Sequence, residues 1–231
     1  MLKGIDVSYA QGNFNWKAVN REEVQFAMLR AGYGWAVSQK DMQNFRQKDK
    51  QFEDNYRGCK ENGIPCGVYW YSYAETAEHA RLEAETCLEV IKDKIFEYPI
   101  VFDIEEERSK INASDICTAF CKTIEKAGYY VSIYGSVSYL TSFISNDILK
   151  KYDVWVAHYG VEKPGYQGKY GMWQYSCNGR VSGCAGDVDL DYSYKNYPEI
   201  INKGGLNGFV SKTFFRRFVN FNIYLLLIYA T

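Results

Sequence analysis

Two carboxylic acids, Asp103 and Glu105, follow an apolar run and stand two residues apart along the chain. In an extended strand, residues i and i+2 project to the same side, with their Cα atoms about 6.6 Å apart. Like charges held so close together raise at least one of the two pKa values. A carboxyl group that stays protonated near neutral pH can protonate a leaving sugar oxygen, while its neighbour stabilises the developing positive charge. The apolar residues 99–102 favour such a role, because a buried strand rarely delivers carboxylates to a core without a purpose.

Further acidic residues lie at the ends of two other predicted strands. Asp6 ends the first strand, and the last strand carries Asp187, Asp189 and Asp191. Clustered carboxylates also suit Mg²⁺ or Ca²⁺, but neither a phosphate-cradling glycine loop nor an EF-hand pattern accompanies them. We therefore expect no metal and no cofactor, and acid catalysis by carboxyl groups is the favoured chemistry.

The histidines and cysteines argue against other kinds of active site. The chain has two His and seven Cys without a C-x-x-C motif, which disfavours a zinc site. Neither His79 nor His158 accompanies a nucleophile motif such as G-x-S-x-G, which disfavours a catalytic triad. Cys177 and Cys184 flank a turn that contains glycine and could pair if oxidised; the alternative is that the cysteines are buried free thiols.

Eight short segments rich in Val, Ile and Tyr are predicted to be strands. Several are apolar at consecutive positions, which is typical of strands covered on both faces, as in a parallel sheet. The predicted strands are residues 4–7, 26–31, 66–71, 100–104, 130–134, 154–157, 172–175 and 188–190.

Helical periodicity separates the first six strands, and helices are expected over residues 49–62, 76–94, 114–127 and 138–151. Gly63 and Gly128 supply stop signals, and Ser114 is a candidate N-cap. The order is strand–helix five times and then three strands. This order predicts a single-domain α/β fold, an irregular TIM-like barrel, with function at the carboxyl ends of its strands.

Length and charge limit the possible partners. A chain of 231 residues suits one domain with a full core. The net charge is -1 without a basic stripe, which argues against nucleic acid, and we expect no obligatory protein partner. Some of the 21 Tyr residues fill the core, whereas those near strand ends could line a groove in which sugars stack on the rings.

The C-terminal tail differs in composition from the predicted barrel, which we place over residues 1–203. Glycines at 204, 205 and 208 predict a hinge, and residues 218–230 are largely apolar but too few to span a bilayer comfortably. We expect 204–231 to be a docked or poorly ordered appendage, with membrane-surface contact as the alternative. No signal peptide is visible before the first strand, so either a leader was removed or the protein reaches its substrate without one.

Ordered motifs between residues 3 and 192 resemble family 25 glycoside hydrolases, the lysozyme family that includes fungal, bacterial and phage muramidases. The motifs include Gly4-Ile5-Asp6-Val7-Ser8, Phe26-Ala27-Met28-Leu29-Arg30-Ala31-Gly32, Gly63-Ile64-Pro65-Cys66-Gly67-Val68-Tyr69-Trp70-Tyr71-Ser72, Tyr98-Pro99-Ile100-Val101-Phe102-Asp103-Ile104-Glu105, Trp155-Val156-Ala157-His158-Tyr159, Trp173-Gln174-Tyr175-Ser176 and Val188-Asp189-Leu190-Asp191. His158 departs from the polar residue, often Gln, that the family has there.

The resemblance implies a (β/α)5(β)3 barrel that cleaves the β-1,4 bond between N-acetylmuramic acid and N-acetylglucosamine in bacterial peptidoglycan. Glu105 would be the general acid, and Asp103 would orient a substrate N-acetyl group acting as internal nucleophile. Asp6 and Asp189 would complete the acidic cleft. The candidate sugar contacts are Tyr69, Tyr134, Trp155, Tyr159 and Gln174.

A second hypothesis is a catalytically silent barrel that binds peptidoglycan or another glycan. Such a protein would keep the aromatic residues but need no intact acid pair. The presence of both Asp103 and Glu105 favours the enzyme. We expect the enzyme to act on the bacterial cell wall, either outside the cell or after release from the cytoplasm during lysis.

Overall fold

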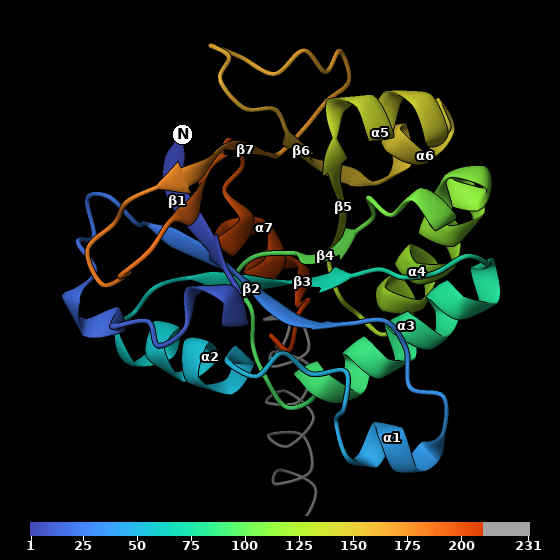
Figure 1. Cartoon of the computed structure of the whole chain (residues 1–231), viewed down its shortest axis with the longest axis horizontal. Helices are drawn as coiled ribbons and strands as arrows, with labels where there is room; N and C mark the ends of the chain where they lie inside the picture. The colour runs from blue at the N-terminus through green and yellow to red at the C-terminus, as the bar shows by residue number, and fades with distance from the viewer. Residues whose placement is uncertain (210–231) are drawn as a thin grey trace, which may run out of the picture.

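The computed structural model describes residues 1–209, which form a closed barrel of eight strands arranged in chain order (Figure 1). The predicted irregular α/β barrel is therefore confirmed. The strands are β1 (Leu2–Val7), β2 (Phe26–Tyr33), β3 (Cys66–Tyr71), β4 (Ile100–Asp103), β5 (Val131–Ser136), β6 (Asp153–Ala157), β7 (Met172–Gly179) and β8 (Val188–Ser193). The helices are α1 (Gln39–Gln43), α2 (Phe52–Glu61), α3 (Ala77–Ile91), α4 (Ala113–Lys126), α5 (Val137–Phe143), α6 (Asn146–Lys151), α7 (Tyr197–Gly204) and three short 3₁₀ helices, η1 (Tyr9–Gln11), η2 (Trp16–Ala18) and η3 (Glu107–Asn112).

The last strand runs against its neighbours. β1 to β7 are parallel, whereas β8 is antiparallel to both β7 and β1. A parallel strand needs a long crossover connection, and the short loop between β7 and β8 allows only a return. Our expectation that the carboxyl end of the last strand joins the other carboxyl ends was wrong, because the amino end of β8 reaches that face.

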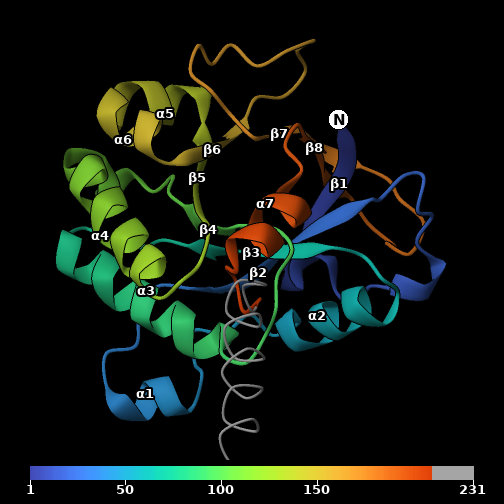
Figure 2. The same ribbon diagram turned by 180° about the vertical axis from the view of Figure 1, so that it is seen from behind.

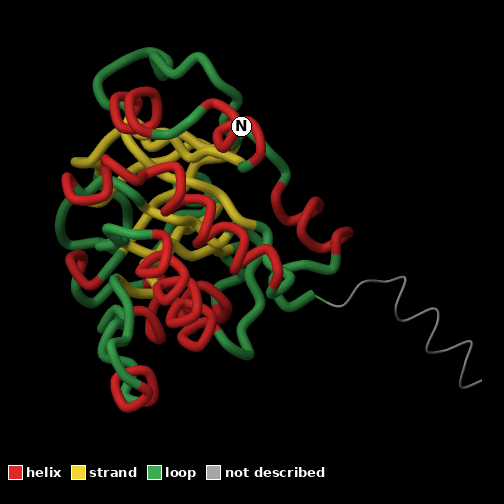
Figure 3. The backbone as a smooth tube through the Cα atoms, turned by 90° about the vertical axis from the view of Figure 1, so that its right-hand side faces the viewer, coloured by secondary structure: helices red, strands yellow, loops and turns green. Residues whose placement is uncertain are grey.

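Two apolar layers hold the barrel together. The barrel interior is filled by side chains such as Phe26, Met28 and Met172. A second layer lies between the strands and the helices outside them (Figure 3), where Phe102 of β4 stacks on Phe120 of α4 with ring centroids 4.2 Å apart. All four residues of β4 are buried, which explains its continuous apolar sequence up to the first carboxylate.

The predicted helices are present, except that one of them is divided into two shorter helices. α2, α3 and α4 lie within or beside the predicted ranges, but the helix expected over 138–151 is two helices, α5 and α6. Ile144 has an extended backbone between them, and Ser145 is the N-cap residue of α6. The N-cap position of α4 is Asn112 rather than Ser114, whose hydroxyl instead accepts the backbone N–H of Ser145 at 2.9 Å.

α7 packs across the amino end of the barrel (Figure 2), where the Tyr197 hydroxyl donates to Asp153 at 2.7 Å. The glycines that we interpreted as a hinge end this helix, because Gly205 adopts the left-handed conformation that caps it. Asn207 is fully buried; its side chain donates to the Tyr98 carbonyl at 2.8 Å and accepts the Tyr130 N–H at 2.7 Å.

Residues 204–209 are thus bonded to the barrel, and the boundary that we drew after residue 203 falls too early. The remainder of the predicted tail, residues 210–231, lies outside the described residues. Within residues 1–209, no helix has the length and apolar character needed to cross a membrane.

Candidate active site

The nine site residues predicted from the sequence line one pocket of about 310 Å³ at the face where the parallel strands end. The structure therefore brings all nine residues together in one place. We call this site the acidic pocket; its predicted lining residues are Asp6, Tyr69, Asp103, Glu105, Tyr134, Trp155, Tyr159, Gln174 and Asp189, and Arg30, Tyr71 and Cys177 complete it.

The acid pair differs in its exposure. Asp103 ends β4 between Tyr71 of β3 and Tyr134 of β5, and its side chain is buried, with no hydrogen-bond partner for Oδ1. Glu105 follows the strand and stays accessible to solvent at the edge of the pocket. Burial, and then repulsion by Glu105, raise the pKa of Asp103. Desolvation, and then repulsion by Glu106, raise the pKa of Glu105.

Gln174 connects three side chains across the pocket. Its carbonyl oxygen Oε1 accepts the hydroxyls of Tyr134 and Tyr159, each at 2.6 Å, and its Nε2 donates to Oδ2 of Asp6 at 2.7 Å. The amide oxygen can accept both tyrosine hydroxyls, and the amide nitrogen then faces the Asp6 carboxylate, which accepts its hydrogen. The network fixes the positions of side chains from β1, β5, β7 and the loop that follows β6.

Three carboxylates meet where β8 closes against β1. Asp6 lies opposite Asp189 in the strand register, and Asp191 lies one pleat deeper, where it is fully buried and accepts Trp155 Nε1–H at 2.9 Å. Burial, and then repulsion by Asp191 and Asp189, raise the pKa of Asp6 well above its usual range. Asp187 does not line the pocket; it forms an exposed ion pair with Arg180.

Comparison with known proteins decides the family. The model for "Glycosyl hydrolases family 25" matches residues 5–184, which include every residue that lines the acidic pocket except Asp189. The chain belongs to glycosyl hydrolase family 25.

Three relatives of this glycosyl hydrolase have descriptive names. The autolytic lysozyme of Clostridium acetobutylicum is 28% identical over 192 residues, covering 82% of this chain and 55% of that protein. The crystal structure of the CTP1L endolysin superposes with a TM-score of 0.75 at 26% identity, covering 87% of this chain and 69% of that one. The autolysin LytC from Streptococcus pneumoniae, solved with a synthetic peptidoglycan ligand, gives a TM-score of 0.66 at 29% identity, covering 82% of this chain and 46% of LytC.

The family 25 pocket contains one cation that we did not predict. Arg30 of β2 points into the pocket, and its Nε lies 2.7 Å from Oδ2 of the buried Asp49. Its charge lowers the pKa of Asp103, opposing the effects of burial and of Glu105. A signal was present in the sequence, because Arg30 is the only charged residue in an otherwise apolar predicted strand.

Two residues near the pocket make contacts that support its edges. Glu106 is half-buried and accepts the Tyr71 hydroxyl at 2.8 Å. His158, the departure from the family pattern, is not among the pocket residues. Its Nδ1 accepts the Gly165 N–H at 2.9 Å and so braces the loop between β6 and β7.

The cysteines are free thiols in this glycosyl hydrolase. Cys177 lines the acidic pocket, and it does not pair with Cys184. Among residues 1–209, no group of three His, Cys, Asp or Glu side chains has the geometry to hold a metal ion. The acidic pocket therefore offers carboxyl groups, tyrosine hydroxyls, an amide and a guanidinium for chemistry.

Proposed function

We propose that this glycosyl hydrolase is a muramidase, which hydrolyses the β-1,4 bond between N-acetylmuramic acid and N-acetylglucosamine in peptidoglycan. The observation that carries the proposal is the acid pair: an accessible Glu105 with a raised pKa stands beside a buried Asp103 with an unpaired oxygen. Glu105 is the general acid, because only an accessible carboxyl group can reach the glycosidic oxygen.

Asp103 assists through the substrate's own acetamido group. The buried Oδ1 of Asp103 is an unused acceptor, and an acetamido N–H is a donor of matching chemistry. Accepting that N–H favours the ionised form of Asp103 and turns the acetamido oxygen toward the anomeric carbon. Since Asp103 and Glu105 repel each other when both are charged, ionisation of Asp103 favours the protonated form of Glu105, which catalysis requires. Substrate binding thus selects the productive protonation state.

The remaining pocket residues bind the sugar. Tyr159 is 44% exposed and offers its ring to a sugar face, while Tyr134 and Gln174 line the pocket beside it. Asp6 and Asp189 line the pocket with acidic groups, which stabilise the positive charge that develops in the transition state. Tyr69 and Trp155 pack edge to face, with ring centroids 6.1 Å apart, and shape the base of the pocket.

The relatives support action on the bacterial cell wall. Their names include an autolytic lysozyme, an endolysin and an autolysin solved with a peptidoglycan ligand. We propose that this chain meets the same polymer, either outside the cell or after release during lysis, and needs no cofactor to cut it.

The test replaces the acid without changing its shape. Glu105→Gln should lower the rate of turbidity loss of purified walls by about 10²- to 10⁴-fold, the usual contribution of a general acid. Glu107→Gln is the matched control, because Glu107 is exposed two residues further on and should leave the rate unchanged. A folded Glu105→Gln protein that lyses walls at the normal rate would refute the assignment.

A further inference from the structure

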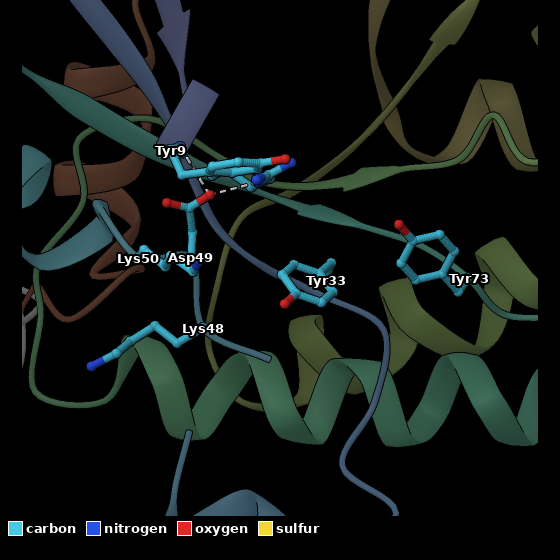
Figure 4. Close-up of a pocket in the computed structure, with 7 residues that line it drawn as sticks. Tyr9, Tyr33, Lys48, Asp49, Lys50 and Tyr73 are labelled. Atoms are coloured by element: carbon cyan, nitrogen blue, oxygen red, sulfur yellow. Dashed lines mark hydrogen bonds and ion pairs between the residues drawn. The ribbon is translucent and has the colours of Figure 1, made fainter. Parts of the chain in front are cut away.

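A second pocket, of about 360 Å³, adjoins the acidic pocket and shares Arg30 with it. We call it the tyrosine pocket, after Tyr9, Tyr33 and Tyr73, which surround it together with Asp49 and Lys50 (Figure 4). The three tyrosines follow β1, end β2 and follow β3, so the pocket continues the cleft beyond the carboxyl ends of the first strands.

The two pockets carry opposite charge. The acidic pocket holds Asp6, Asp103, Glu105 and Asp189 against a single cation, Arg30. In the tyrosine pocket the only acidic side chain is Asp49, which is fully buried and receives hydrogen bonds from Arg30 Nε at 2.7 Å and from the backbone N–H of Tyr9 at 3.1 Å. Asp49 therefore offsets one cation and offers little negative charge to a ligand.

The cations in the tyrosine pocket are available for a ligand to different extents. Lys50 is exposed and forms no ion pair within residues 1–209. Lys48, at the rim, lies 3.2 Å from Glu53. The Arg30 guanidinium stacks over the Tyr9 ring, with its carbon 4.7 Å from the ring centroid, and its buried Nη2 has no partner. Within residues 1–209, Lys50 is thus an unpaired cation that a ligand can reach, whereas the Arg30 guanidinium is held in place by Asp49 and Tyr9.

The tyrosine rings provide a partly apolar surface. Tyr9 is 54% exposed and Tyr33 is 37% exposed, and Tyr33 packs edge to face on Tyr73 with ring centroids 6.3 Å apart. A positive site lined by exposed rings suits a chain that carries carboxylates and short aliphatic groups. A neutral sugar would make no use of Lys50.

We infer that the tyrosine pocket binds the carboxylate-bearing peptide attached to the lactyl group of muramic acid, an inference that rests on the proposed function. A muramic acid bound in the acidic pocket would direct its peptide outward, and the ionised Asp103 would repel the negative carboxylates of that peptide. The adjoining positive pocket, reached past the shared Arg30, receives them. The site makes the enzyme prefer peptide-bearing glycan over glycan stripped of peptide.

The test compares two substrates: purified glycan strands with their peptides, and the same strands after an amidase has removed the peptides. Lys50→Glu should raise KM for the peptide-bearing strands about five- to tenfold and leave kcat/KM for the stripped strands unchanged. Added salt should raise KM only for the peptide-bearing strands. Lys126→Ala is the control, because Lys126 is exposed at the end of α4 and does not line the tyrosine pocket.

A binding measurement separates this inference from the proposed function. We would titrate Glu105→Gln with a disaccharide-peptide and with the same compound after its carboxylates are converted to amides. We expect Glu105→Gln to bind the amidated compound more weakly than the compound with free carboxylates. In Glu105→Gln/Lys50→Glu, the two compounds should bind with equal affinity. Equal effects of Lys50→Glu on both substrates, or none on either, would overturn the inference. Failure of the wild type to cut either glycan, with charge-dependent binding intact, would overturn only the proposed reaction.

Discussion

Replacing Gln174 by Leu tests whether the hydrogen-bond network shapes the acidic pocket. Leu has a similar size but cannot donate to Asp6 or accept from the tyrosines. The substitution removes the 2.7 Å bond to Asp6 and both 2.6 Å bonds from Tyr134 and Tyr159. Tyr159 is half-exposed and can turn to water, whereas Asp6 and Tyr134 are buried and cannot.

The size of the effect follows from the two groups left unpaired. A buried polar group without a partner costs about 1–3 kcal/mol, so Asp6 and Tyr134 together predict a loss of about 2–6 kcal/mol in the free energy of unfolding. The Tm of a domain of this size falls roughly 2–4 °C per kcal/mol. We therefore expect Gln174→Leu to lower Tm by about 4–24 °C at pH 8.

The effect should depend on pH in a defined direction. Burial raises the pKa of Asp6, and the bond from Gln174 partly opposes that rise by favouring the ionised carboxylate. A carboxyl group whose pKa is raised by folding contributes stability while it is protonated, and this stability is lost as pH rises. Gln174→Leu raises the pKa of Asp6 further, so its destabilisation should be larger at pH 8 than at pH 4.5.

Calorimetric unfolding of the wild type and Gln174→Leu at both pH values provides the assay. Gln167→Leu is the control, since Gln167 is exposed and its side chain bonds only to the nearby Gly165 carbonyl. Its Tm should change by less than about 2 °C. An equal loss of Tm for Gln174→Leu at both pH values, or a larger loss at pH 4.5, would refute this account of Asp6.

Two further predictions concern buried polar residues outside the pocket. Asn207→Ala should lower the free energy of unfolding by about 2–4 kcal/mol in chemical denaturation, because the buried Tyr98 carbonyl and the partly buried Tyr130 N–H lose their partner. Asn202→Ala should cost far less, because Asn202 is partly exposed. Glu83 is fully buried, and burial raises its pKa to about 7 from 4.5, so stability should fall across that interval. Between pH 4.5 and 7, Glu83→Gln should remove up to about 3 kcal/mol of the fall in the free energy of unfolding. If the free energy of unfolding of Glu83→Gln fell with pH as steeply as that of the wild type, this account of Glu83 would be wrong.

The parts of the fold that local sequence determines were predictable. β4 is apolar at consecutive positions and ends on Asp103, so its burial and the position of the acid pair follow from its own residues. The same holds for α3, whose N-cap Thr76 accepts the His79 N–H at 3.1 Å. Strand order also followed, because alternating strands and helices leave few ways to close a barrel.

The parts that depend on distant contacts were not predictable. The direction of β8 reverses the geometry of Asp189 and Asp191, and nothing within that strand specifies direction. Arg30 is held by Asp49, which is 19 residues away along the chain and carries no motif. α7 did have local signals, namely the Asn196 cap, a proline in its first turn and Gly205, but we interpreted the glycines as a hinge.

The placement of Asn207 explains why that interpretation failed. A glycine-rich segment is consistent with either a flexible linker or a helix cap, and only the contacts that follow distinguish the two. Here the following residue is buried and bonds to chain segments 77 and 109 residues away. Deleting residues 204–231 should consequently cost at least as much stability as Asn207→Ala.

Mass spectrometry of the fragments released from purified peptidoglycan tests the central claim most directly. The identity of the new reducing end reports which glycosidic bond was cut. If the proposed roles of Glu105 and Asp103 are right, the wild type releases fragments that end in reducing N-acetylmuramic acid, and Glu105→Gln releases almost none. Fragments that end in reducing N-acetylglucosamine, or wall binding without any new reducing end, would contradict the account.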